Sequence, residues 1–216
     1  MYNNILELNG LSLEKLDSLS YRSKLGISLK NTLHHFDKDQ LLDELYEMRS
    51  WLNELDILDD IDLDYRIKSI ESIDGKYQRY FDSNRQTRQI FNDILGFSGF
   101  CDDYEEIKEF DTSLFHIADM TQGKANDDGY RGIHVYYEED NFTYPIEIQF
   151  NTLFDRQLNN WLHDYLYKKD YPNAIGKIMR MEYEHGHITN IAEFEEVLKN
   201  VLSGSERREQ AWQHCF

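Results

Sequence analysis

The chain has 216 residues, of which 40% are hydrophobic and 14% aromatic, with only 2 prolines, so it should fold around a core rather than stay disordered. Its formal net charge of −18 argues against a protein that coats nucleic acid non-specifically. No apolar run reaches the length of a membrane span, the N-terminus lacks a secretion signal, and 2 cysteines are too few for a disulfide framework, so we expect a cytoplasmic protein.

Helices are expected at the start of the chain. Residues 39–55 repeat apolar side chains with a period near 3.6, and Asp39 is the expected N-cap. A second helical stretch is predicted over residues 60–81, with a distortion near Gly75. The first 60 residues are therefore expected to form an N-terminal helical segment.

Strands are expected in the middle of the chain. Residues 91–100 and 113–121 are short and apolar, whereas residues 132–139 and 143–151 alternate and are joined by a polar turn, which predicts a hairpin. Helices return over residues 153–168. These patterns predict an α/β (α+β) protein in which helices flank a central mixed sheet of about five strands.

The C-terminal part is expected to be helical again. A helix is predicted to begin at Asn190, with Glu193 completing a capping box. Residues 203–216 are read as a short terminal helix or a tail. The expected division is an N-terminal segment over residues 1–60, a core over residues 61–170 and a C-terminal segment over residues 171–216, packed as one compact domain.

A basic stretch precedes the predicted strands. Lys68, Ser72 and Lys76 are spaced to share one helix face, and Arg66 lies just before them. Cations and a hydroxyl in a row suit a chain of phosphates. The solvated face of an amphipathic helix is the open alternative.

Two further features indicate anion or metal binding. Asp93 lies in an apolar stretch, where a carboxylate is costly unless it is paired or bound to a metal, and one carboxylate with nucleotide phosphates commonly holds Mg²⁺. The alternative is an aspartate that caps a turn in solvent. Arg22, Lys24 and Lys30 lie in a stretch without acids, which is either a local anion site or an ordinary fluctuation of surface charge.

The hairpin has one polar face. If its strands pair, His134, Glu147, Gln149 and Asn151 line one surface, which is either a site or the wet side of an ordinary sheet. Just before it, glycines bracket Tyr130, and such a loop can present an aromatic ring to a ligand base.

The motifs occur in a family order. "RIKSIESIDGK", "NDILGFSGF", "GYRGIHVYY", "PIEIQFNT" and "WLHDYLYK" follow one another in a way that resembles the synthetase domain of the RelA/SpoT family, over about residues 65–168. The resemblance implies a nucleotidyltransferase-like fold. It also implies a Mg²⁺-dependent ATP pyrophosphokinase that moves pyrophosphate to a ribose 3′-hydroxyl.

The resemblance implies roles for individual residues. ATP binding is expected of Arg66, Lys68, Ser72 and Lys76, and acceptor binding of Tyr130, His134 and Gln149. Asp93 is expected to be a Mg²⁺ ligand, and Glu147 a catalytic base or a second metal ligand. Neither cysteine belongs to a matching motif.

Two positions depart from the family pattern. Ser98 and Asn151 stand where the family usually has arginines. We therefore expect weaker handling of a free GDP or GTP acceptor, which is typical of the toxic small alarmone synthetases of toxin–antitoxin pairs. The expected acceptor is then the 3′ CCA end of tRNA, bound in part by Arg22, Lys24 and Lys30, with an antitoxin protein as partner.

Other functions stay open. One is a (p)ppGpp synthetase with GDP or GTP as acceptor, and another is a catalytically inactive nucleotide- or RNA-binding module. No hydrolase domain and no long regulatory region is recognised beside the motifs, so a synthetase-only form is expected. Oligomeric state is left open by the sequence.

Overall fold

The computed structural model describes residues 6–7, 10–169 and 171–213, with side chains up to residue 203. Cys215 lies outside these residues. The chain divides into two compact units: residues 1–118 with 133–150, and residues 119–132 with 151–216. The expected boundaries near residues 60 and 170 stay a prediction.

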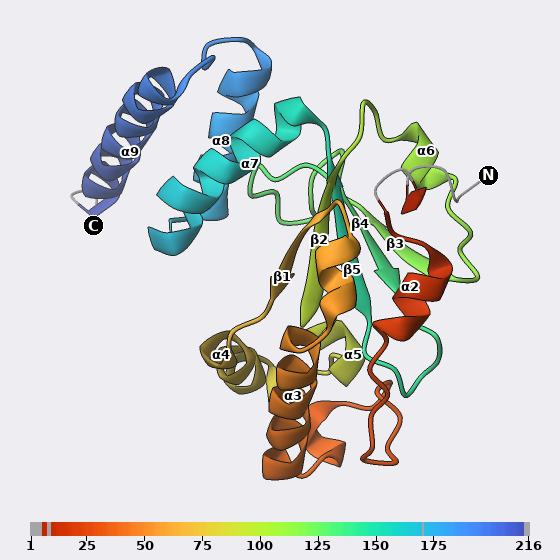
Figure 1. Cartoon of the computed structure of the whole chain (residues 1–216). Coiled ribbons are helices and arrows are strands. Elements are labelled where there is room, and N and C mark those ends of the chain that lie inside the picture. The colour runs from red at the N-terminus through yellow and green to blue at the C-terminus, as the bar shows by residue number, and fades with distance from the viewer. Residues whose placement is uncertain (1–5, 8–9, 170, 214–216) are drawn as a thin grey trace. The chain divides into compact units, whose positions relative to one another are not determined.

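Five strands form the sheet in the order β1-β2-β5-β4-β3 (Figure 1). The strands are β1 Asp64–Ile67, β2 Leu95–Phe100, β3 Phe115–Asp119, β4 Ile133–Tyr137 and β5 Ile146–Asn151. The helices are α2 Leu13–Ser18, α3 Lys38–Asn53, α4 Ile70–Tyr80, α5 Thr87–Ile90, α6 Glu105–Lys108, α7 Leu153–Tyr165, α8 Asn173–Glu184 and α9 Ile191–Gln213, with 3-10 turns at Leu33–His35, Asp56–Asp60 and Tyr167–Lys169. This is the helix-flanked mixed sheet that the sequence predicts.

The predicted hairpin is confirmed. Strands β4 and β5 pair antiparallel, with His134 opposite Gln149 and Tyr136 opposite Glu147. Alternate side chains on both strands, such as Val135 and Ile148, are fully buried in the core of the first unit. The other side chains point to the opposite face, as the period of two dictates. That face carries the ionisable residues.

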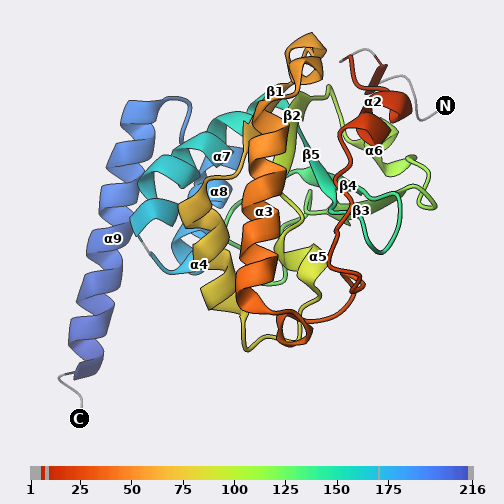
Figure 2. The same cartoon turned by 60° about the horizontal axis from the view of Figure 1, so that its bottom comes forward.

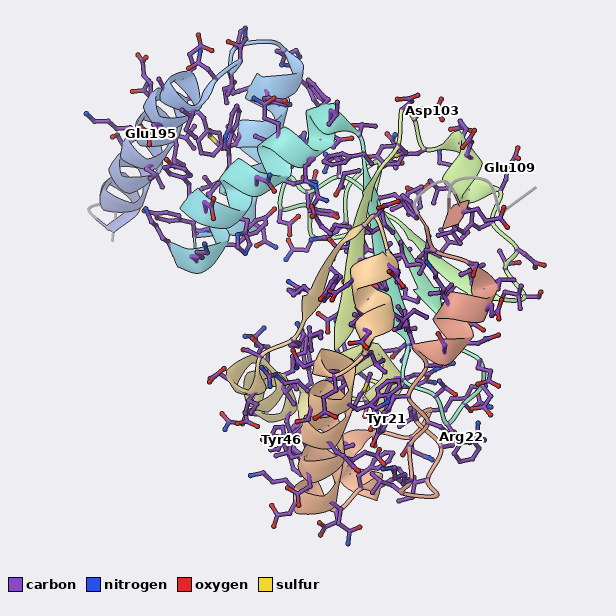
Figure 3. All side chains as sticks on the ribbon, in the orientation of Figure 1. Tyr21, Arg22, Tyr46, Asp103, Glu109 and Glu195 are labelled. Carbon is purple, nitrogen blue, oxygen red and sulfur yellow. The ribbon has the colours of Figure 1, made fainter. Side chains whose placement is uncertain are left out.

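Helix α3 covers the apolar face of the sheet. It presents Leu45, Met48 and Leu52 to the core, while its N-cap is Asp37, whose side chain accepts a hydrogen bond from the Gln40 N–H at 3.0 Å. The cap thus lies two residues before the expected one at Asp39. Helices α3 and α4 lie side by side (Figure 2), and Tyr46, labelled in Figure 3, donates to Asp74 of α4.

A buried glutamate ties α3 to the chain around β5. Glu44 is 5% exposed and accepts hydrogen bonds from the Tyr144 hydroxyl at 2.9 Å and the Lys24 N–H at 2.6 Å. Burial is the largest cause that raises the pKa of Tyr144, followed by the nearby Glu44 charge. A buried carboxylate with two donors is stabilising only as long as both remain.

Strand β1 replaces part of the helix predicted over residues 60–81. Because β1 is an edge strand, its residues Asp64, Tyr65 and Arg66 are all exposed. The sequence there shows no alternation of apolar and polar residues that would predict a strand. The helix that follows, α4, begins after the cap residue Ser69 and runs through Gly75 without a break.

The second unit has its own core. Its buried side chains come from α7, α8 and α9 and include Leu158, Leu162, Met179 and Phe194. One half of the predicted capping box is found at the start of α9, where the Asn190 side chain accepts from the Glu193 N–H at 3.1 Å. The Glu193 carboxylate accepts from the N–H of Thr189 at 2.7 Å instead of from that of Asn190. The described part of the terminal segment continues α9 to Gln213. In the described residues, no helix is long and apolar enough to cross a membrane.

Candidate active site

Asp93 is the centre of a cluster of cations. It lies between α5 and β2, not inside a strand as the sequence suggested. Its carboxylate pairs with Lys68 Nζ at 2.6 Å, Lys76 Nζ at 2.7 Å and Arg66 Nη2 at 3.7 Å. Burial lowers the pKa of the Lys68 ammonium, and the nearby Asp93 charge offsets part of that effect.

These three cations come from β1, from α4 and from the segment between them. Arg66 is on β1, Lys68 follows that strand and is buried, and Lys76 is on α4, where its Nζ also donates to the Ile90 carbonyl at 2.8 Å. Lys68 therefore precedes the helix instead of sharing a helical face with Lys76. Ser72 lies exposed in the first turn of α4, where its N–H donates to the Ser69 hydroxyl at 3.3 Å and its own hydroxyl accepts from the Ser69 hydroxyl at 3.1 Å.

Glu147 is a buried carboxylate with three polar neighbours. It is 4% exposed, accepts from Gln149 Nε2 at 2.7 Å and from the Tyr136 hydroxyl at 3.1 Å, and lies 3.0 Å from His134 Nδ1. Burial alone would raise the pKa of Glu147, but the hydrogen bonds and charge of these neighbours, His134 first, hold it below its ordinary value. The carboxylate is thus kept ionised.

Gly96 connects the two clusters on one sheet face. In the pairing of β1 with β2 it lies directly opposite Arg66. A Cβ atom at Gly96 would lie 3.4 Å from Glu147 Oε2, in van der Waals contact, so the Glu147 side chain packs next to Gly96. Arg66, Gly96 and Glu147 therefore follow one another across β1, β2 and β5.

The donor set of this face fits a magnesium ion that is completed by a ligand. Among the described residues, no group of three histidine, cysteine, aspartate or glutamate side chains forms a metal site. Mg²⁺ usually binds one or two carboxylates together with substrate phosphates instead of an all-protein cage. Asp93 and Glu147 are carboxylates of that kind, and Lys68 and Lys76 are suited to the phosphates.

A pocket of about 540 Å³ opens beside Tyr136. Tyr136 forms part of its wall and stacks on His116 with ring centroids 6.2 Å apart, while its hydroxyl contacts Glu147. The lining also includes Arg85 and the ion pair of Arg88 with Glu138. The pocket is of a size that admits part of a nucleotide, and Arg85 is the lining cation that is not in this pair.

Tyr130 belongs to the second unit. Its ring is partly exposed and has Lys124 Nζ 4.8 Å above it. The neighbouring Arg131 pairs with Asp127 at 2.8 Å, and that hydrogen bond is the largest cause of a lowered pKa at Asp127. Asn151 is buried and donates to the Arg131 carbonyl at 2.9 Å, so it holds the backbone next to Tyr130.

The expected RNA patch is partly neutralised. Arg22, at the surface of the first unit (Figure 3), pairs with Asp140 at 2.7 Å, and Lys24 pairs with Glu47 at 2.8 Å. Lys30 is exposed. Exposed pairs of this kind are weak and open easily to a stronger anion.

Several residues of these sites are absent from the sequence-based expectation. Tyr136, Gly96, His116 and Arg88 each depend on contacts between strands or with α5. The alternation of β4 already places Tyr136 on the face of His134, so this one residue carries a readable signal. The others do not.

A comparison with known families decides what the chain is. The family model described as "Region found in RelA / SpoT proteins" matches residues 65–172, which is 108 of the 216 residues. The chain belongs to the RelA/SpoT family. The sites around Asp93 and Glu147 lie inside the matched region, and the enzyme class expected from the sequence, a RelA/SpoT-type pyrophosphokinase, agrees with this membership.

Solved structures give a weaker likeness. Small alarmone synthetase 1 from Bacillus subtilis is 21% identical, with 79% of this chain and 93% of that chain covered and a TM-score of 0.40. The same protein bound to its product pppGpp is 20% identical, with 80% of this chain and 91% of that chain covered and a TM-score of 0.42. A GTP pyrophosphokinase family protein from Streptococcus pneumoniae is 21% identical, with 95% of this chain and 100% of that chain covered and a TM-score of 0.37. No curated protein matches the chain.

Proposed function

We propose that this RelA/SpoT-family chain transfers pyrophosphate from ATP to a ribose 3′-hydroxyl. The observation that carries the proposal is a pair of carboxylates in the family region. Glu147 is buried on the polar face of the sheet, and Asp93, just before β2, is paired with Lys68, Lys76 and Arg66. The 3′-oxygen bonds to the β-phosphorus of ATP, the bond from that phosphorus to the α–β bridging oxygen breaks, and AMP leaves.

The cations around Asp93 are assigned to ATP. Lys68 and Lys76 already hold a carboxylate at 2.6 and 2.7 Å, which shows that their ammonium groups converge on one anionic position. ATP phosphates would share these lysines with Asp93, and the planar guanidinium of the exposed Arg66 suits stacking on the adenine. Ser72, at the first turn of α4, lies where backbone N–H groups favour phosphate oxygens.

Glu147 is assigned the proton of the attacking hydroxyl. Its pKa is below the ordinary glutamate value, so it is ionised at neutral pH and available as a base. His134, Tyr136 and Gln149 fix the carboxylate by the contacts given above. Fixed donors of this kind keep the base oriented and limit the rearrangement needed for reaction.

Magnesium is the cofactor we assign to this face. The residues that would hold it are Asp93 and Glu147. Bound there, the ion would neutralise charge on the transferring phosphates.

The proposed acceptor is the 3′ CCA end of tRNA, which would make the protein a translation-inhibiting toxin with a cognate antitoxin. Ser98 and Asn151 support this choice because the family usually has arginines there, and Asn151 is used to hold the Arg131 carbonyl. Tyr130 would stack on the terminal base. Arg22, Lys24 and Lys30 would contact phosphates further along the RNA.

A GDP or GTP acceptor is the second candidate. The observation in its favour is that Arg22 and Lys24 are occupied by Asp140 and Glu47, so the surface offers RNA less free positive charge. The pocket beside Tyr136, whose lining includes Arg85 and the ion pair of Arg88 with Glu138, has room for the phosphates of a free nucleotide. The two acceptors therefore differ in which cations they need.

One assay distinguishes these functions. The chain is incubated with Mg²⁺, γ-labelled ATP and either deacylated tRNA, GDP or GTP, and the labelled acceptor is identified. Label on tRNA supports the toxin, label on GDP or GTP supports an alarmone synthetase, and no label on any acceptor contradicts pyrophosphate transfer and favours a binding module.

A charge variant tests the RNA patch. Changing Arg22, Lys24 and Lys30 to glutamate should reduce transfer to tRNA and weaken its salt dependence. The control is Lys108→Glu, since Lys108 is a surface cation of the same unit that pairs with Glu105. Undiminished transfer to tRNA by the triple variant contradicts the patch.

A further inference from the structure

Arg180 is a buried cation beyond the family region. It is on α8, eight residues past the end of the match at residue 172, and it is 1% exposed. Its guanidinium donates three hydrogen bonds inside the second unit: Nε to the Gly129 carbonyl at 2.8 Å, Nη1 to Asp155 Oδ1 at 2.7 Å, and Nη2 to Asn159 Oδ1 at 3.1 Å. Nε also lies 3.8 Å from Glu184 Oε1. One side chain thus joins α7, α8 and the loop before β4.

The partners of Arg180 hold the other side of Tyr130. Asn159 donates to the Arg131 carbonyl at 2.7 Å and its Oδ1 accepts from the Arg131 N–H at 3.2 Å. Asn151 donates to the same carbonyl. The peptide groups before and after Tyr130 are therefore both fixed, one by Arg180 directly and one through Asn159.

The helix and the loop also touch backbone to backbone. Gly129 has a φ of 88°, and a Cβ there would lie 2.3 Å from the Gly176 carbonyl oxygen. A Cβ at Gly176 would lie 1.9 Å from the Asp128 carbonyl oxygen. No side chain fits between α8 and the loop, so α8 is a close support for the loop.

This arrangement is costly if its purpose is stability alone. Burial lowers the pKa of the Arg180 guanidinium, with Asp155 the first group that offsets it. A buried ion pair is often no more stable than apolar side chains of similar volume, and its best-attested use is to select one arrangement. The arrangement selected here is the backbone on both sides of Tyr130.

We propose that Arg180 is a positioning residue for acceptor binding: it fixes the loop from which Tyr130 meets the acceptor base. This inference rests on the proposed function, because it takes Tyr130 as an acceptor contact. Arg180 acts through the loop and is not itself a catalytic residue. The support for the acceptor loop thus lies in a helix that follows the family region.

The variant Arg180→Lys tests the geometry with the charge retained. A lysine ammonium keeps the pair with Asp155, but a single nitrogen cannot reproduce the fork that also reaches Gly129 and Asn159. We expect the acceptor KM to rise about tenfold or more, while the ATP KM stays within about twofold. The matched control is Met179→Ala, the fully buried neighbour on α8, which lowers stability through a cavity and leaves the acceptor KM within about twofold.

Hydrogen exchange gives a readout that does not depend on activity. The amides of Gly129 to Arg131 should exchange faster in Arg180→Lys than in Met179→Ala when the two are compared below their melting temperatures. Asn159→Ala removes the side chain that bonds the Arg131 N–H and carbonyl, and it leaves the ion pair of Arg180 with Asp155 in place. It should raise the acceptor KM and the exchange rate of the loop amides in the same way.

The outcomes separate the two proposals. If the wild-type chain labels no acceptor, the proposed function fails, while the exchange comparison still decides whether Arg180 holds the loop. Unchanged loop exchange and an unchanged acceptor KM in both Arg180→Lys and Asn159→Ala overturn the inference. Equal increases of the acceptor KM in Arg180→Lys and Met179→Ala also overturn it, because they indicate a general loss of stability.

Discussion

Glu147→Gln removes the proposed base with little change of shape. The side chain is 4% exposed, and a glutamine keeps an oxygen that accepts one hydrogen bond while its amide nitrogen faces the second donor position. General-base catalysis contributes about 10²- to 10⁴-fold, so the transfer rate should fall by that factor, equivalent to about 3–5 kcal/mol in the barrier.

The same change affects folding to a smaller extent. Glu147 accepts hydrogen bonds from Gln149 and Tyr136 and lies beside His134, and the loss of charge weakens these contacts. Hydrogen bonds to charged groups contribute about 1.5–3 kcal/mol each, and the glutamine retains part of that, so we expect the free energy of unfolding to fall by about 1–3 kcal/mol. The variant should remain folded at 25 °C.

A second buried glutamate of the same unit provides the control. Glu44 is 5% exposed and accepts from Tyr144 and the Lys24 N–H, away from the polar face. Glu44→Gln should cost comparable stability and leave the transfer rate within about threefold, since only structural hydrogen bonds change. Rates are measured with labelled ATP and saturating acceptor, and stability by urea unfolding. The reasoning is refuted if folded Glu147→Gln transfers within about tenfold of wild type, or if Glu44→Gln loses as much rate.

Three further predictions concern the other groups. Asp93→Asn should lower the free energy of unfolding by about 2–4 kcal/mol, because it leaves Lys68 buried without its carboxylate partner. In urea unfolding, adding Lys68→Met should restore part of this stability. An unchanged stability of the single variant would contradict a stabilising role for the buried pair. Tyr130→Ala should raise the acceptor KM about 5- to 150-fold through lost stacking of about 1–3 kcal/mol, with Tyr130→Phe close to wild type as the control in steady-state kinetics. The pKa of Asp127 is lowered in the fold by Arg131. The contribution of Asp127 to stability is therefore complete above its unfolded pKa and is lost as the pH falls through its folded pKa. Asp127→Asn should flatten the acid side of a curve of stability against pH, and an unchanged curve would contradict a stabilising pair of Asp127 with Arg131.

The part of the fold that the sequence predicts is the part with local periodicity. The hairpin of β4 and β5 follows from alternation, and the cap of α9 follows from the spacing of Asn190 and Glu193. Strand β1 is missed because an exposed edge strand carries charges where a pattern would otherwise show. For the same reason the sequence pattern predicts a helix face for the neighbouring Lys68.

Long-range contacts limit what the sequence says about the site. The residues Lys68, Lys76 and Asp93 were each predicted to serve phosphate or metal binding, but no spacing rule indicates that both lysines reach the same carboxylate. The family pattern marks Asn151 as a position where an arginine is missing. In the fold its side-chain amide donates a hydrogen bond to the Arg131 carbonyl, which the sequence pattern does not indicate. The roles of these residues in catalysis stay predictions until the variants are measured.

The glycine contact in the second unit constrains how this chain can be recombined with its relatives. Gly129 and Gly176 meet at a distance that excludes any side chain, although one is in the loop before β4 and the other is on α8. A chimera that imports residues 119–132 from another family member, to change acceptor preference, would carry a loop shaped for a different support. Such a transplant should fail unless α8 is exchanged with it, so the loop and the helix are one module for engineering.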